Sequence, residues 1–159
     1  MQFKNVVGNS EIKDVLIKEV RRSVVPHAQL FESKDDANTI PMALAYATYL
    51  LCQNRQQIDS CGTCHHCVKM SKLVHPDLHF FYPSVQNTKL KKTSSLDYLS
   101  NFKEMLIERP SRGLTCWTKK MGFDKLSKDS IRVKDSEVIK NIVLKKSYEG
   151  AYSIFIIWH

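Results

Sequence analysis

The chain has 159 residues, of which 43% are hydrophobic and 25% charged, as is typical of one globular domain with a core of its own. No apolar run approaches the ~20 residues that cross a bilayer, and the start of the sequence lacks a secretory pattern, so we expect a cytoplasmic protein without a membrane partner. The net charge of +8 permits an anionic partner such as nucleic acid, although a solvated lysine-rich surface explains it equally well.

The first half of the chain has the pattern of a helix, a strand and a second helix. Ser10 is placed to cap a helix that runs to about Arg22. Residues 28–31 predict a short buried strand, and residues 32–40 are polar and turn-like. Pro41 suits the first turn of the next helix, which is apolar on most sides and is therefore expected to be buried.

The second half continues this alternation. Residues 78–82 predict a strand, and residues 96–108 predict an amphipathic helix. Asp135 is placed to cap a further helix, and the apolar run 153–158 is typical of a central strand in a parallel sheet. Alternating strands and helices indicate an α/β fold with right-handed crossovers. The chain ends at His159 directly after this strand, so we expect it to be a fragment of a longer protein.

Four of the five cysteines are grouped, at Cys52, Cys61, Cys64 and Cys67. In a chain without export signals, grouped cysteines more often hold metal than form disulfides. Two-residue gaps let neighbouring thiolates point at one tetrahedral zinc ion, and Gly62 provides the tight turn between them. Four thiolates leave no open position for water, so the spacing predicts one structural zinc rather than a catalytic one.

Other uses of these residues are weaker hypotheses. A Cys-x-x-Cys pair could serve redox chemistry, but two overlapping pairs and a fourth cysteine favour metal. His65 and His66 are possible substitutes for a cysteine ligand, although with four cysteines available we expect them to be surface residues. Cys116 lies far off in the sequence and is expected to be an ordinary thiol.

Residues 28–41 have the order of elements on which P-loop enzymes place their phosphate-binding loop. A working loop reads G-x-x-x-x-G-K-[ST], because glycines let backbone N–H groups reach the phosphates and the lysine neutralises them. Residues 32–40 contain no glycine, and acidic side chains there would oppose a triphosphate. The degenerate loop includes Glu32, Asp35, Asp36 and Thr39.

The last strand lacks a second requirement for ATP hydrolysis. Functional ATPases of this kind hold Mg²⁺ with an acidic residue at the end of this strand. Here the strand ends in Trp158 and His159, without a carboxylate. We therefore expect no bound ATP or Mg²⁺, no nucleotide-binding residues, no catalytic residues and no ATPase activity.

Several short segments together resemble a known family. The segments are residues 3–9, residues 26–31, the four spaced cysteines, residues 75–78, residues 131–133 and residues 149–152. In this order they resemble the N-terminal AAA+ domain of bacterial DNA polymerase III clamp-loader subunits, and the lost phosphate loop is similar to the delta-prime type rather than gamma/tau. The resemblance covers essentially the whole chain.

The resemblance implies a P-loop NTPase fold, a RecA-like parallel sheet flanked by helices. It implies one domain over residues 1–159 with a zinc module inserted at 52–67, and it maps the family's four zinc ligands onto the four grouped cysteines. The family's helical lid, collar domain and trans-acting arginine motif lie beyond this chain. The implied role is a non-catalytic, stator-like subunit that helps load the sliding clamp on DNA during replication. Its implied partners are gamma/tau and delta subunits, with DNA and the clamp met through the assembled complex.

Residues 83–130, which include Trp117, do not match the family pattern, and we expect a surface elaboration there. A sharper hypothesis is that Lys89, Lys91 and Lys92 contact a phosphate backbone. Two alternatives to the stator role also stay open. One is an ATP-binding subunit of the gamma/tau type with an unorthodox loop; the other is a zinc-dependent nucleic-acid-binding module.

Overall fold

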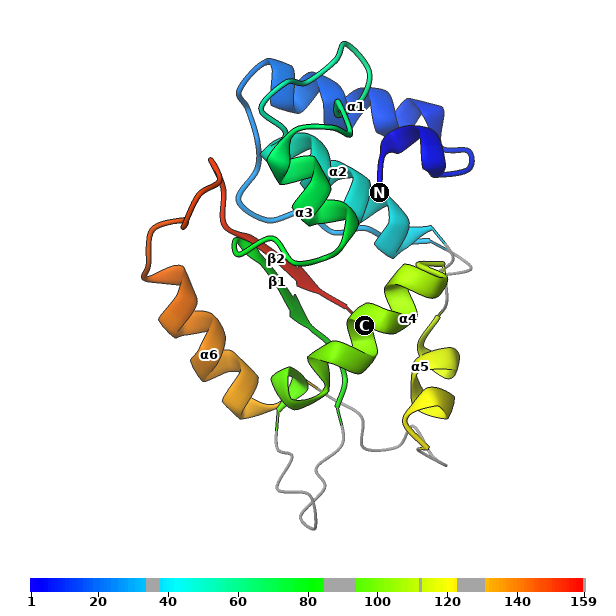
Figure 1. Cartoon of the computed structure of the whole chain (residues 1–159), viewed down its shortest axis with the longest axis vertical. Helices are drawn as coiled ribbons and strands as arrows, with labels where there is room; N and C mark the ends of the chain where they lie inside the picture. Colours follow the sequence, from blue (N-terminus) through cyan, green and yellow to red (C-terminus); the bar gives the residue numbers. More distant parts are fainter. Residues whose placement is uncertain (34–37, 85–93, 112, 123–130, 159) are drawn as a thin grey trace. The chain divides into compact units, whose positions relative to one another are not determined.

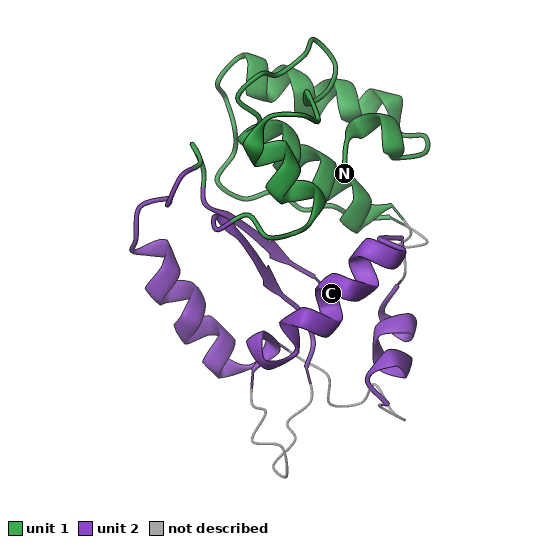
Figure 2. Cartoon of the chain, viewed as in Figure 1, with its two compact units in different colours: residues 1–75, 150–152 green, residues 76–149, 153–159 purple. Residues whose placement is uncertain are grey.

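The structure is a computed structural model that describes residues 1–33, 38–84, 94–111, 113–122 and 131–158 (Figure 1). The chain divides into two compact units, coloured separately in Figure 2. Unit 1 comprises residues 1–75 and 150–152, and unit 2 comprises residues 76–149 and 153–159. None of the helices in these described ranges is both long and apolar enough to span a membrane.

Helices make up unit 1 in the part of the chain that the structure describes. Its central helix, α2, is buried over almost its whole length, because it is apolar on nearly every side. Pro41 occupies the first turn of α2, where its missing N–H group costs nothing, as predicted. The elements of unit 1 are the short 3-10 helix η1 (Phe3–Asn5), α1 (Ser10–Arg21), α2 (Thr39–Leu51) and α3 (His65–Ser71).

Two local predictions in unit 1 are wrong. Ser10 is the first residue of α1 rather than its cap; Asn9 takes the cap position with a left-handed backbone (φ 55°). Residues 28–31 form no strand, and the side chain of Leu30 is 90% exposed. A strand needs a neighbour for its N–H and C=O groups, and unit 1 has no strand among its described residues.

Unit 2 contains two parallel strands, β1 (Leu78–Phe81) and β2 (Ile154–Ile157), which lie side by side in Figure 1. Leu78 pairs with Ile154 and Phe81 with Ile157. Parallel neighbours need a long crossover, and the helices between them in the sequence provide it, which confirms the α/β class. Those elements are η2 (Ser95–Tyr98), α4 (Leu99–Glu108), α5 (Leu114–Lys120) and α6 (Val133–Val143).

The segment expected to be a surface elaboration instead contributes to the core of unit 2. The side chain of Trp117, on α5, is 0% exposed, and its Nε1 donates to the Pro83 carbonyl oxygen at 2.8 Å. Its ring meets those of Tyr82 and Phe102 edge-on, at centroid distances of 5.1 and 5.3 Å. The prediction is wrong because the partners of Trp117 are distant in the sequence, so no local pattern indicates its burial.

The start of α6 and the edge of the sheet also differ from expectation. Helix α6 begins at Val133, so Asp135 is its third residue rather than its cap. The Asp135 carboxylate still closes the first turn, because it accepts the N–H group of Arg132 at 3.0 Å. Strand β2 was expected to be central, yet within the described residues it pairs with β1 alone, and Ile157 is 58% exposed.

Candidate metal centre

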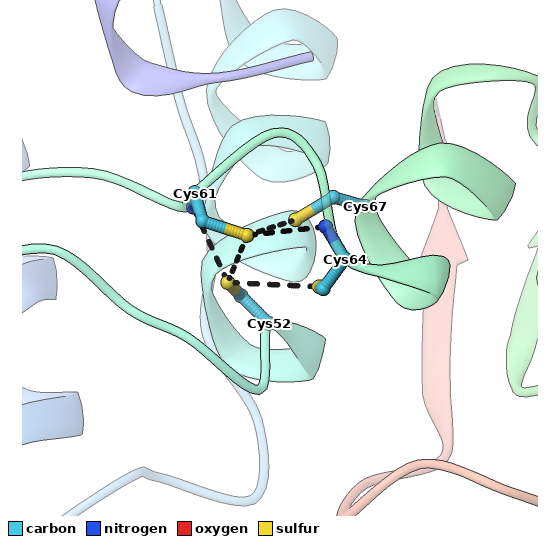
Figure 3. A group of neighbouring side chains, drawn as sticks. All are labelled: Cys52, Cys61, Cys64 and Cys67. Atoms are coloured by element: carbon cyan, nitrogen blue, oxygen red, sulfur yellow. Dashed lines mark hydrogen bonds between the residues drawn. The ribbon is translucent and has the colours of Figure 1, made fainter.

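Three elements of unit 1 bring the four grouped cysteines together (Figure 3). Cys52 caps the C-terminal end of α2. Cys64 is the cap residue before α3, and Cys67 lies in the first turn of that helix. Cys61 projects from the intervening loop toward the other three, as Figure 3 shows. A helix end and a helix start thus provide a fixed frame for the loop between them.

The spacing of the sulfur atoms suits one tetrahedral metal ion. The Sγ atom of Cys61 lies 3.5 Å from that of Cys52 and 3.9 Å from that of Cys67. The Sγ atoms of Cys52 and Cys64 are 4.0 Å apart, and all four sulfurs lie within 4.8 Å of one another. A zinc–sulfur bond of about 2.3 Å places tetrahedral ligands about 3.8 Å apart. All five cysteines of the chain are free thiols, so no disulfide competes for these atoms.

Backbone N–H groups point at two of the sulfurs. The N–H group of Cys61 donates to the Sγ atom of Cys52 at 3.3 Å, and that of Cys64 donates to Cys61 Sγ at 3.3 Å. The N–H groups of Cys64 and Thr63 lower the pKa of the Cys61 thiol to about 6, because they stabilise its thiolate. Cys61 is therefore ready to bind a cation at neutral pH.

Two of the other thiols have a pKa shifted in the opposite direction. Burial raises the pKa of Cys52 and of Cys67, because a buried thiolate without a counterion is unfavourable. A divalent cation at the centre of the cluster would supply the missing positive charge and favour the thiolate form. The donor set, four sulfurs without an oxygen ligand, fits a soft or borderline metal such as zinc.

The loop that carries Cys61 is built to turn tightly. Gly62 has a left-handed backbone (φ 76°), which a residue with a Cβ adopts only with strain. Arg55 satisfies the end of α2, since its guanidinium donates to the carbonyl oxygens of Tyr49 at 2.8 Å and Leu50 at 2.6 Å. These two features hold the loop close to the helix from which it departs.

The histidines next to the cluster have other contacts. His66 is buried, contrary to the surface position expected, and its Nδ1 lies 2.7 Å from Nε2 of the buried His75. His65 is exposed. Neither belongs to the group of four sulfurs. Cys116 is also exposed and is not a member of the group of four.

Comparison with known proteins identifies the family. Residues 8–159 match the sequence profile of the family described as "DNA polymerase III, delta subunit". The chain belongs to this family. It is 32% identical over 92 residues to the DNA polymerase III subunit delta' of Buchnera aphidicola subsp. Baizongia pistaciae (strain Bp). No solved structure matches.

The match to that relative is partial. It covers 55% of this chain and 26% of the relative, so the chain spans about a quarter of the length of the curated protein it matches. Together with the family profile, it confirms the resemblance to a clamp-loader protein of the delta-prime type. The chain is thus a member of the family described as DNA polymerase III, delta subunit, and is similar to a delta-prime protein.

The segment predicted to be a degenerate phosphate loop is described in part. Asp35 and Asp36 lie outside the described residues, whereas Glu32 and Thr39 border a small hollow of about 40 Å³. That volume has room for only a few water molecules. The described residues around the hollow are Asn9, Ile12, Phe31, Glu32, Ser33, Asn38, Thr39 and Met42.

One predicted contact is untested, and one residue was missed. Lys89, Lys91 and Lys92 all lie outside the described residues. The missed residue is Asp59, whose carboxylate accepts the N–H groups of Phe3 and Lys4, each at 3.0 Å. Because these contacts join residues 56 and 55 positions apart, no local pattern in the sequence indicates them.

Proposed function

We propose that this chain is a non-catalytic, stator-like part of the DNA polymerase III clamp loader, which helps place the sliding clamp on DNA. Membership of the family supports the assignment to the clamp-loader assembly. The glycine-free segment before α2 is the observation that supports a non-catalytic role. A phosphate loop works through backbone N–H groups that glycine makes accessible and through a lysine next to the helix start. Here Ile40 and Pro41 stand at the start of α2 instead.

The described surroundings of that segment support the same conclusion. The hollow beside the start of α2 includes the Glu32 side chain, whose negative charge would repel a triphosphate. A triphosphate would bind there only if this carboxylate were neutralised.

The end of β2 provides separate support within unit 2. Where an ATPase would hold Mg²⁺ with a carboxylate, this chain has Trp158, which is buried and lies 5.6 Å from the ring of Phe102. The N–H group of Trp158 donates to the Phe81 carbonyl oxygen at 2.8 Å, which continues the strand pairing. An apolar ring offers no ligand to a magnesium ion.

The finer structural assignments belong to the same proposal. The two parallel strands are part of a P-loop NTPase sheet of the AAA+ type, and residues 1–159 form one such domain with the zinc module at 52–67. One zinc ion is bound by Cys52, Cys61, Cys64 and Cys67 and has a structural role. The partners are gamma/tau and delta subunits in the cytoplasm, with DNA and the sliding clamp reached through the complex.

Nucleotide binding tests the non-catalytic role directly. We expect isothermal titration with Mg-ATP to give no saturable signal up to ~1 mM, a concentration that detects sites of even ~100 μM affinity. A gamma/tau-type subunit titrated under the same conditions provides the positive control. Saturable binding in the micromolar range, or ATP hydrolysis above background, would favour the alternative of an active subunit with an unorthodox loop.

A further inference from the structure

The amino-terminal turn (residues 2–5) is held by the loop that carries Cys61, and this contact has no part in the proposed role. The two carboxylate oxygens of Asp59 accept one N–H group each, Oδ1 from Phe3 and Oδ2 from Lys4, both at 3.0 Å. The side-chain amide of Gln2 donates to the carbonyl oxygen of Ser60 at 2.6 Å. Three adjacent residues are thus held by three hydrogen bonds to two residues of the loop, Asp59 and Ser60.

Each of these contacts satisfies a group that needs a partner. The N–H groups of Phe3 and Lys4 lie at the start of η1, where no earlier carbonyl group is available within the turn. A carboxylate that accepts backbone N–H groups forms short, strong hydrogen bonds. The ring of Phe3 is 2% exposed and lies 5.8 Å from that of Tyr49, so detachment of the turn would expose an apolar side chain.

The position of Asp59 depends on the cysteine cluster. Residues 53–58, which lead to Asp59 from Cys52, are exposed. Inside the loop, Asp59 is held by local bonds, since its carbonyl oxygen accepts the Gln56 N–H group at 2.8 Å and its Oδ1 accepts that of Ser60, also at 2.8 Å. These bonds shape the loop around Asp59, whereas Arg55 ties the first part of the loop to the end of α2 through the carbonyl oxygens of Tyr49 and Leu50.

The far end of the loop is fixed two residues later, at Cys61. Its N–H group donates to Cys52 Sγ at 3.3 Å, and its own sulfur lies 3.5 Å from that atom. A metal ion would replace these weak sulfur contacts with bonds to all four cysteines. Without the ion, only these weak sulfur contacts would hold this end of the loop.

We infer that metal occupancy of the four-cysteine cluster controls the docking of the amino-terminal turn, and that Asp59 is the residue that couples the two. With metal bound, the loop presents the Asp59 carboxylate to the N–H groups of Phe3 and Lys4. With metal removed, the loop moves, the two N–H groups lose their acceptor and Phe3 leaves Tyr49. The inference rests on the metal centre proposed above and is independent of the role in clamp loading.

Hydrogen exchange measured by NMR at individual amides tests this coupling. Zinc-loaded protein and protein treated with a strong zinc chelator are compared, and zinc is measured by elemental analysis in both samples. We expect exchange at the Phe3 and Lys4 amides to accelerate at least about tenfold on chelation. The amide of Ile17, in α1, is an internal reference and should change far less.

An aspartate-to-asparagine substitution isolates the coupling residue. Asp59→Asn removes one acceptor and the charge, so we expect faster exchange at Phe3 and Lys4 while zinc remains bound. Asp14→Asn makes the same chemical change at an exposed position of α1 and serves as the matched control. Exchange that stays slow in Asp59→Asn would contradict the role of this carboxylate.

The two proposals fail in distinguishable ways. Unchanged exchange at Phe3 and Lys4 after zinc has demonstrably been removed would overturn the coupling and leave the metal centre standing. Purified protein without zinc, and with thiols that bind none when it is added, would overturn the metal centre and the coupling together.

Discussion

Asp135 shows how a single buried carboxylate can connect distant parts of unit 2. Its side chain is completely buried. Its Oδ1 accepts the N–H group and the hydroxyl of Ser95, both at 2.9 Å, and its Oδ2 accepts the N–H group of Arg132 at 3.0 Å. A buried charge is tolerated only when it is fully hydrogen-bonded, and these three donors provide that.

Asp135→Asn should therefore destabilise the protein although it preserves the shape of the side chain. Hydrogen-bond donors face both carboxylate oxygens of Asp135. In the variant, the NH₂ group of the asparagine would therefore face another donor on one side, with no acceptor there. We expect the free energy of unfolding in urea to fall by roughly 2–3 kcal/mol. Glu137→Gln, the equivalent change at an exposed position of the same helix, should stay within about 0.5 kcal/mol of the original. Equal stability of the two variants would show that the buried contacts contribute nothing.

Gly62 and Gly8 permit a second comparison at the residue scale. Both have left-handed backbones, with φ of 76° and 70°, so alanine should cost about 1–2 kcal/mol at either position. A Cβ at Gly8 meets open space, whereas one at Gly62 comes within 3.0 Å of Gln2 Oε1. We expect Gly62→Ala to cost about 1 kcal/mol more than Gly8→Ala, because Gln2 must give up its bond to Ser60.

Adding Gln2→Ala to both glycine variants tests whether the lost bond between Gln2 and Ser60 explains the extra cost of Gly62→Ala. Gln2→Ala alone loses the same bond, so the double variant Gln2→Ala, Gly62→Ala should be less destabilised than the sum of its parts. Additive costs in thermal or urea unfolding would mean that Gln2 and Gly62 do not interact.

At the scale of elements, α5 is attached to unit 2 by the buried ring of Trp117 and by an ion pair between Lys120 and Glu104 of α4, at 2.9 Å. Trp117 is fully buried against Tyr82 and Phe102 and donates to Pro83. Trp117→Ala should lower the free energy of unfolding by about 3–5 kcal/mol, as is usual when a buried large aromatic residue is removed. Tyr148→Ala is the control, because that ring is 84% exposed. A small effect of Trp117→Ala would mean that α5 contributes little to the core.

Elements with a strong local pattern could be predicted from the sequence, and those that depend on distant partners could not. The amphipathic pattern of α1 and the apolar character of α2 identified both helices. Residues 28–31 have an equally apolar pattern, but a strand forms only where another strand pairs with it. The burial of Trp117 was not predicted for a related reason, since its partners Tyr82 and Pro83 follow β1 and Phe102 lies in α4.

At the scale of the whole molecule, the cysteine spacing was the most informative feature. Short gaps between Cys61, Cys64 and Cys67 indicate proximity directly, whereas Cys52 joins them because α2 ends where the loop returns. Asp59 could not be found in this way, because its partners are fixed only by the folded chain. The order of motifs along the chain indicated the clamp-loader family, and the family profile over residues 8–159 confirms it.

The most direct test of the account is the zinc content of the purified chain and of its Cys64→Ser variant. We predict about one zinc per chain, with loss of the metal and a thermal midpoint lowered by more than about 5 °C in the variant. Cys116→Ser, which changes an exposed thiol outside the cluster, should retain both metal and stability. A metal-free chain that unfolds at the same temperature as its Cys64→Ser variant would contradict the account, because the four cysteines would then be ordinary thiols.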